Sequence, residues 1–147
     1  MGEKVTYHPA IWGGKKLAYP NVPPDGPKFS ASVVAGNHIF ISGCQGANDA
    51  TMQVETAVFE EQMRIALDKV RACMEQAGSC MDNVIKMTIL ITDRADYAAM
   101  RRTEFEYYRE HAPRLVEDPP ASTLMVVGLG KPEYLVELDV VGVVSRG

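Results

Sequence analysis

Two carboxylates interrupt an apolar segment near the end of the chain, at Glu137 and Asp139 of YLVELDVVGVV. Side chains two residues apart on a β-strand point to the same face, so these two acids share one face and Val136, Leu138 and Val140 take the other. A carboxylate there is a solvated rim charge, is paired, or is held in a cleft. In a cleft, loss of water raises its pKa toward values that suit proton transfer or the orientation of a water molecule. The pattern leaves these alternatives open.

A second candidate is the segment SGCQG, residues 42–46, at the end of a predicted strand. Its glycines would let backbone N–H groups approach a ligand closely. Cys44 in this segment could act as a nucleophile, but His8, His38 and His111 are scattered and none has a spacing that identifies an activating base. We therefore favour a packed or cleft-lining thiol for Cys44.

A third candidate is PPAST, residues 119–123, which offers the hydroxyls of Ser122 and Thr123 before a predicted strand, although it could be a simple strand entry. The chain has no Walker loop, dinucleotide-binding glycine fingerprint, nucleophile elbow or HExxH motif. Its three cysteines have no zinc-type spacing, which favours free thiols in a reducing compartment. We expect neither a cofactor nor a metal.

Composition is typical of one soluble globular domain covering residues 1–147, with 46% hydrophobic and 23% charged residues. Lys and Arg total 15 against 19 Asp and Glu, a net charge of -4, which disfavours a nucleic-acid-binding role. No apolar leader begins the chain, and no segment approaches the roughly 18 apolar residues of a membrane span. We expect a cytoplasmic protein with no membrane partner.

The predicted elements alternate between strands and helices. Residues 1–29 are expected to form an irregular arm, because residues 9–27 are dense in Gly and Pro. Residues 30–35 and 37–42 predict an antiparallel hairpin that turns at Gly36-Asn37. Next, apolar residues spaced by threes and fours predict a helix that ends at Gly78. They are Phe59, Met63, Ala66, Leu67, Val70, Cys73, Met74 and Ala77.

The second half continues with a strand over residues 84–91, whose apolar face we expect to carry Ile85, Met87, Ile89 and Ile91. Asp93 can cap a helix over residues 94–111. Residues 122–128 and 134–144 predict two further strands. On the helix, the side chains available for burial are Tyr97, Met100, Phe105 and Tyr108.

This order predicts an α+β fold, in which a mixed sheet is covered by two helices on one face. The second sheet face is half apolar, and nothing else in the chain is left to cover it. Homo-oligomerisation, with clefts between subunits, is the natural consequence.

The ordered series of segments resembles the Rid family, the reactive-intermediate (enamine/imine) deaminases also called YjgF-like proteins. The resemblance runs from about residue 27 to residue 144. It rests on GPKFSASVVAGNHIFISGCQG, EEQMRIALDKVRACMEQAG with MDNVIKMTILITDRADYAAM, and PPASTLMVVGL with YLVELDVVGVV. It implies a chorismate-mutase-like subunit in a homotrimer, with ligand sites between subunits and no cofactor.

The resemblance also implies roles for individual residues. Glu137 falls where the family positions a hydrolytic water that attacks an imine carbon, and the substrate carboxylate is bound by an arginine of a PARS-like segment. The arginine position reads Ala121 here, which offers no charge or donor in its place. Cleft-lining or substrate-binding positions correspond to Phe29, Ser30, Gly43, Cys44, Ala121, Ser122 and Thr123.

Two ways around the missing arginine are conceivable. Arg101, Arg102 or Arg114 could reach the cleft and bind an anion, although each is more simply a solvated charge. Alternatively, the substrate could lack that carboxylate and be held by Ser122, Thr123 and backbone amides.

Two functions therefore remain in view. The first is a cofactor-free hydrolytic enzyme of the Rid type, which acts on a small enamine, imine or related catabolic intermediate with Glu137 orienting water. The alternative is a non-catalytic, trimeric small-ligand-binding or regulatory protein that has lost deaminase activity, as Ala121 suggests. Ribonuclease activity, sometimes attached to members of the family, is disfavoured by the acidic charge balance.

Overall fold

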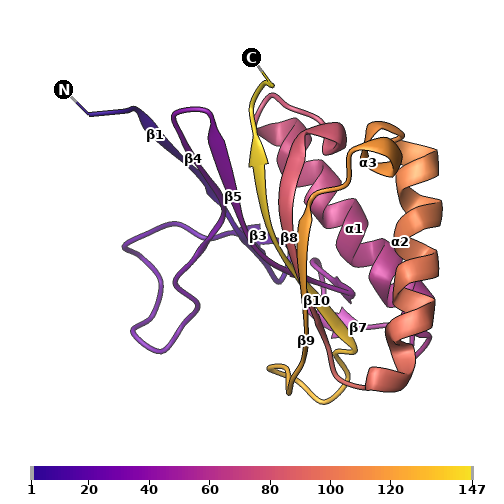
Figure 1. Ribbon diagram of the computed structural model, residues 1–147. Coiled ribbons are helices and arrows are strands. Elements are labelled where there is room, and N and C mark those ends of the chain that lie inside the picture. Colours follow the sequence, from indigo (N-terminus) through magenta and orange to yellow (C-terminus); the bar gives the residue numbers. More distant parts are fainter. Residues whose placement is uncertain (1, 147) are drawn as a thin grey trace.

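The computed structural model describes residues 2–146 and contains one six-stranded sheet in the order β1-β4-β5-β10-β8-β9. Neighbouring strands are antiparallel except for β8 and β9, which are parallel. Helices α1 and α2 cover one sheet face, as Figure 1 shows, so the predicted mixed sheet with two helices on one face is confirmed. The elements are β1 (Val5–Pro9), β4 (Ser30–Ala35), β5 (His38–Gln45), α1 (Phe59–Gln76), β8 (Val84–Ile91), α2 (Tyr97–His111), β9 (Ala121–Val126) and β10 (Val136–Val143).

The arm expected to be irregular contains regular structure. Residues 5–9 form β1, which pairs with β4 at the outer edge of the sheet, so this part of the prediction was wrong. The alternation of apolar and polar side chains in VTYHP, residues 5–9, was the sequence signal that could have predicted this strand. Short strands β2 (Ile11–Trp12) and β3 (Lys15–Lys16) follow and pair with each other. The remaining small elements are β6 (Ala47–Asn48), β7 (Gln53–Val54), the 3-10 turns η1 (Met81–Asn83) and η2 (Arg94–Asp96), and α3 (Arg114–Glu117).

The predicted hairpin and first helix are confirmed. Ala35 pairs with His38, which leaves the two-residue turn Gly36-Asn37, and β5 runs on to Gln45. Helix α1 buries the residues of its predicted apolar face against β5 and β10, and Met74 is fully buried. Cys73 is half-buried and packs against this core.

One residue of β8 departs from the predicted alternation. Ile85 is exposed, whereas Val84 is buried with Met87, Ile89 and Ile91. The cause is a bulge: Gly142 pairs with Val84 and Val141 with Lys86, so Ile85 has no partner on β10. An extra residue of this kind reverses the side-chain alternation on one side of it.

Helix α2 begins at Tyr97, after the turn in which the Asp93 side chain accepts a hydrogen bond from the Ala95 N–H at 2.8 Å. Met100 and Tyr108 are buried as expected. Tyr97 and Phe105 are instead 46% and 49% exposed, so their predicted burial was wrong. Each of these two rings lies beneath an arginine of the same helix, within 6 Å. The core positions are taken by Thr103 and Tyr107.

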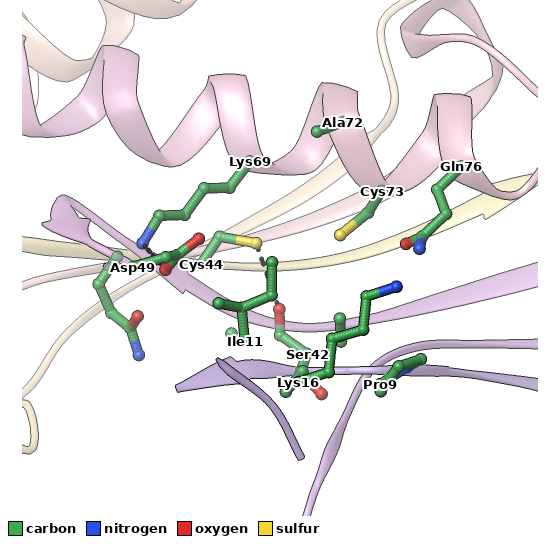
Figure 2. A pocket seen from close by; sticks show the side chains of 14 residues that line it. Pro9, Ile11, Lys16, Ser42, Cys44, Asp49, Lys69, Ala72, Cys73 and Gln76 are labelled. Carbon is green, nitrogen blue, oxygen red and sulfur yellow. Dashed lines mark hydrogen bonds and ion pairs between the residues drawn. The ribbon is translucent and has the colours of Figure 1, made fainter. Parts of the chain in front are cut away.

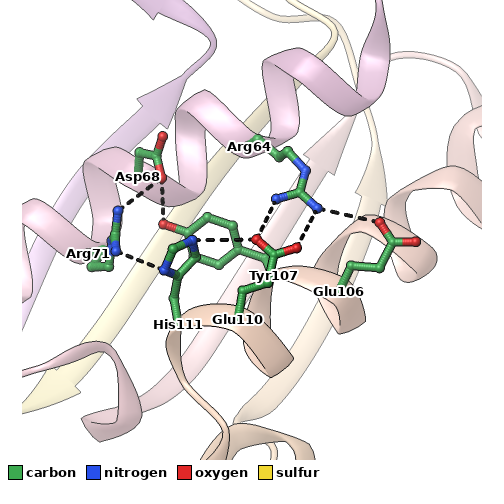
Figure 3. A network of polar contacts seen from close by, with 7 residues as sticks. All are labelled: Arg64, Asp68, Arg71, Glu106, Tyr107, Glu110 and His111. Atoms are coloured by element: carbon green, nitrogen blue, oxygen red, sulfur yellow. Dashed lines mark hydrogen bonds and ion pairs between the residues drawn. The ribbon is translucent and has the colours of Figure 1, made fainter.

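A polar network joins α1 to α2 along their outer sides (Figure 3). The buried Tyr107 donates its hydroxyl hydrogen to Asp68 at 2.7 Å, and Arg64 forms ion pairs with Glu106 and Glu110. Most of these charges are exposed, and exposed pairs contribute little net stability. The network therefore links the outer sides of the two helices, while the apolar core beneath them provides most of the stability.

The opposite face of the sheet is uncovered in the single chain. Large apolar side chains lie on it, with exposed fractions of 43–66% for Val5, Tyr7, Phe40 and Met125. Exposed apolar surface of this kind marks a contact with another molecule.

A single buried glutamine ties α1 to the segment that leads into β10. The Gln62 side-chain amide donates to the carbonyls of Thr56 and Glu133 at 2.9 and 3.0 Å, and its oxygen accepts from the Leu135 N–H at 3.0 Å. Helix and strand approach so closely here that a Cβ at Gly46 would lie 2.6 Å from the Gln62 Cβ. Gly46 of SGCQG is therefore required by packing against α1.

We predict that Gln62→Leu, which keeps the volume but removes all three hydrogen bonds, lowers the free energy of unfolding by about 3 kcal/mol, because it leaves buried backbone groups unpaired. Urea unfolding measures this change. The matched control is Gln76→Leu, an exposed glutamine on the same helix, which should change stability by less than about 0.5 kcal/mol. Equal effects of the two substitutions would contradict the role given to Gln62.

Candidate active site

Glu137 lies at the beginning of β10, on the sheet face away from the helices. It is half-buried and pairs across the strands with Gln45 of β5 and Leu90 of β8. Asp139 shares its face and is exposed, whereas Val136, Leu138 and Val140 are fully buried beneath the helices. The predicted arrangement of the two carboxylates is therefore confirmed.

Gly43 provides the surface on which the Glu137 carboxylate rests. Leu138 pairs with Cys44 but Val140 pairs with Ile41, so Ser42 and Gly43 together oppose Asp139 in a β-bulge. A Cβ at position 43 would lie 1.9 Å from the Glu137 Oε1. Gly43 was expected to let a ligand approach the backbone, whereas in the structure its missing side chain makes room for a carboxylate of the same chain.

The environment of Glu137 raises the pKa of its carboxyl group. Partial burial raises the pKa of the carboxyl above its ordinary value, and the negative charge of Asp139 raises it further. A hydrogen bond with the Gln45 side chain lowers the pKa and so opposes both effects. A carboxylate whose pKa is raised is a stronger base, which suits it to take a proton from water.

Beside Gly43, the strand β5 has a free edge. Strand β4 pairs with β5 only as far as Ile41, so within the described residues 2–146 no strand pairs with residues 42–45 on that side. The Ser42 hydroxyl donates to the carbonyl of Ser30 at 2.5 Å where the two strands separate. Two cavities open along this free edge, and both are lined by Gly43 and Gln45.

The larger cavity, of 380 Å³, lies between the free edge of β5, helix α1 and the N-terminal strands (Figure 2). Lys69 and Asp49 form an ion pair of 3.0 Å at its wall. Burial raises the pKa of both the Cys44 and the Cys73 thiols, so both are neutral, and Cys44 donates to the Ser42 carbonyl at 3.3 Å. A buried neutral thiol is a poor nucleophile, which supports the interpretation of Cys44 as a packed residue.

The smaller cavity, of 260 Å³, is lined by aromatic side chains. Phe29 lies in its wall, as the sequence analysis expected for a cleft residue. Ser30 lies at the start of β4, beside the point where β4 leaves β5. Sequence reasoning did not single out Trp12, Gln45, Lys131 and Tyr134, which also line this cavity.

The PPAST residues lie elsewhere in the single chain. Ala121, Ser122 and Thr123 are exposed on β9, at the far edge of the sheet. Ala121 pairs with Lys86, which in turn pairs with Val141, four residues along β10 from Glu137. At about 3.3 Å per residue, this places Ala121 and Glu137 about 13 Å apart along the strands, in addition to their separation across the sheet. One small molecule bound to one chain cannot touch both.

The three candidate arginines lie on the helical side of the molecule. Arg101 pairs with Glu104 at 3.1 Å, Arg102 with Glu60 at 3.8 Å, and Arg114 with Asp118 at 4.0 Å. None of the three lines either of the cavities beside Gly43. The cation nearest to Ala121 in the strand pairing is Lys86, whose Nζ donates to the Thr123 hydroxyl at 2.8 Å.

Other kinds of site find no support in residues 2–146. Within that range, no group of three or more His, Cys, Asp or Glu side chains is placed to hold a metal ion. Among the same residues, no helix combines the length and the apolar composition needed to cross a membrane.

Comparison with known proteins gives a consistent result. The 2-iminobutanoate/2-iminopropanoate deaminase of Escherichia coli is 30% identical over 129 residues, which is 88% of this chain and 97% of that protein. A RutC family protein of Pyrococcus horikoshii is 34% identical over 93 residues, covering 63% of this chain and 73% of that protein.

A crystal structure of a YjgF family member from Neisseria meningitidis covers all of both chains, with a TM-score of 0.72 and 24% identity, and supports the fold. The family model described as Endoribonuclease L-PSP matches residues 22–144. The chain therefore belongs to this family, the YjgF/RutC or Rid family that its sequence resembles.

Proposed function

We propose that this protein is a cofactor-free deaminase that hydrolyses the C=N bond of a small imine, or of the imine tautomer of an enamine. The observation that carries the proposal is the half-buried carboxylate of Glu137, which lies against Gly43, a residue that lines both cavities. Support comes from the relative named 2-iminobutanoate/2-iminopropanoate deaminase, which aligns over 97% of its length.

The reaction needs only water and one group that moves a proton. As the water oxygen bonds to the imine carbon, the Glu137 carboxylate takes a proton from that water, and the carbon–nitrogen double bond becomes single. Glu137 returns that proton to the nitrogen, which gives the carbinolamine. The same carboxylate then carries the hydroxyl proton to the amine, the carbon–nitrogen bond breaks as the carbonyl forms, and ammonia leaves. A base positioned in this way contributes roughly a hundredfold or more to the rate.

We predict that Glu137→Gln lowers kcat for ammonia release by about a hundredfold or more, because the amide cannot accept the proton of the attacking water. A coupled ammonia assay on imines generated in place measures the rate. Glu75→Gln is the matched control, since Glu75 is an exposed carboxylate of α1 that lines neither cavity beside Gly43, and it should keep the wild-type rate. An unchanged rate in Glu137→Gln would remove the proposed base.

A second prediction concerns pH. Only ionised Glu137 can act as base, so activity should fall as pH falls through its pKa, which lies above the ordinary glutamate value. Because the charge of Asp139 raises that pKa, Asp139→Asn should move the acidic limb of the kcat profile to lower pH. A limb that does not move, or moves to higher pH, would contradict this assignment.

We also propose that the chain works as a homotrimer assembled through the uncovered sheet face, with sites near subunit boundaries. The exposed apolar residues on that face support this proposal, as does the distance between Glu137 and the PPAST segment in one chain. A neighbouring copy would bring a second set of side chains to the cleft.

We predict that light scattering of the wild-type protein gives a molar mass of about three times the 16.1 kDa of one chain. Phe40→Glu, on the uncovered face, should give monomers, because a carboxylate buried at the contact costs several kcal/mol. Phe105→Glu, at an equally exposed phenylalanine of α2, should remain trimeric. Phe40→Glu that stays trimeric would contradict the assignment of this face.

The alternative function is a trimeric ligand-binding or regulatory protein without turnover. It is favoured by Ala121, which is exposed and carries no group able to hold a carboxylate. Thermal stabilisation by imine analogues, together with ammonia release equal in the wild type and Glu137→Gln, would favour this alternative over the deaminase.

A further inference from the structure

The 260 Å³ cavity beside Gly43 has an aromatic wall that the proposed chemistry does not by itself require. The rings of Trp12 and Phe29 meet edge to face, with centroids 6.2 Å apart and planes at 76°. Tyr134 and Met52 also line the cavity. Aromatic pairs in this geometry present ring faces and edges against which another ring packs favourably. The volume is close to the lower end of small-molecule sites, which begin at about 300 Å³.

One cation in this cavity lacks an acidic partner. The Lys131 Nζ donates to the carbonyl of Met52 at 3.2 Å and lies 5.9 Å from the centroid of the Tyr134 ring. Among residues 2–146 it forms no ion pair, whereas the other cavity-lining charge, Asp49, is paired with Lys69. An ammonium group has three hydrogens to donate, so Lys131 retains donors for an anion.

Three lining residues connect the cavity to Glu137. The carboxylate lies against Gly43, Gln45 is its cross-strand partner, and Tyr134 is close enough for the Glu137 charge to affect it. A molecule in the cavity that reaches Gly43 therefore places its end beside the carboxylate.

We propose that this cavity selects substrates with an aromatic side chain, so that the imine hydrolysed is that of an aromatic 2-oxo acid. The ring packs against the wall formed by Trp12 and Phe29, the carboxylate pairs with Lys131, and the imine carbon lies over Gly43. Lys131 thus supplies the positive charge that Ala121 does not. The hydrolysis of an imine in this inference rests on the proposed function, whereas the binding of an aromatic acid in the cavity does not.

The binding test uses the fact that Trp12 is the single tryptophan of the chain. Titration with 3-phenylpropanoate, which has no imine to react, should change Trp12 fluorescence saturably. Propanoate, which lacks the ring, and 3-phenylpropan-1-ol, which lacks the charge, should each bind at least tenfold more weakly. Lys131→Met should weaken binding of the acid about tenfold and leave binding of the alcohol unchanged.

The matched control is Lys15→Met, because Lys15 is the strand partner of Trp12 but lies outside the cavity lining. The Lys15→Met variant should bind 3-phenylpropanoate with the affinity of the wild type. Equal affinity for propanoate and 3-phenylpropanoate, or no saturable response to the aromatic acid, would overturn the inference.

The kinetic test separates this inference from the proposed function. Wild-type kcat/KM should be higher for the imine of phenylpyruvate than for that of pyruvate, and Phe29→Ala should reduce that preference at least tenfold. Glu137→Gln should retain the fluorescence titration while losing turnover. If the protein binds 3-phenylpropanoate saturably but releases no ammonia from either imine, the proposed function is refuted and the aromatic binding site is retained. A preference for the pyruvate imine would refute the substrate class.

Discussion

The structure around the candidate site depends on one close contact, between the Glu137 carboxylate and the backbone of Gly43. A strand carboxylate facing away from the core would ordinarily extend into water. Here the β-bulge at Ser42 and Gly43 and the absence of a side chain at Gly43 let it lie flat against β5. This contact partly removes Glu137 from water, raises its pKa, and places it at the one stretch of β5 where no strand pairs on the other side.

The rest of the chain holds that contact in place. Helix α1 fixes the entry to β10 through Gln62, whose three hydrogen bonds bridge two segments of backbone, and Gly46 lets the helix come close enough to make them. The two glycines of SGCQG therefore serve two different close approaches, one on each side of the sheet. The uncovered face, in turn, leaves the site open to a neighbouring copy.

Much of this arrangement follows from the sequence because it rests on strict periodicity. The apolar face of α1 and the alternation around Glu137 are local patterns, and both are confirmed. Ile85 was misplaced because a bulge depends on pairing with a distant strand, and Phe105 because its ring is covered by a neighbouring arginine.

The roles of Gln45 and Lys131 at the site depend on tertiary structure. No local signal pairs Gln45 with Glu137, since that register is set by a strand more than ninety residues away. Lys131 reaches the aromatic cavity from the segment just before β10, where sequence alone suggests only a turn.

The most direct test of the central contact is Gly43→Ala, with Gly128→Ala as control, because a Cβ at position 128 meets no atom within 4 Å. The added methyl group must displace the end of the Glu137 side chain without unfolding the strand. We expect Gly43→Ala to have an unfolding free energy close to that of Gly128→Ala and an ammonia-release rate at least tenfold lower. Equal rates in the two variants would contradict a role for the contact between Gly43 and Glu137.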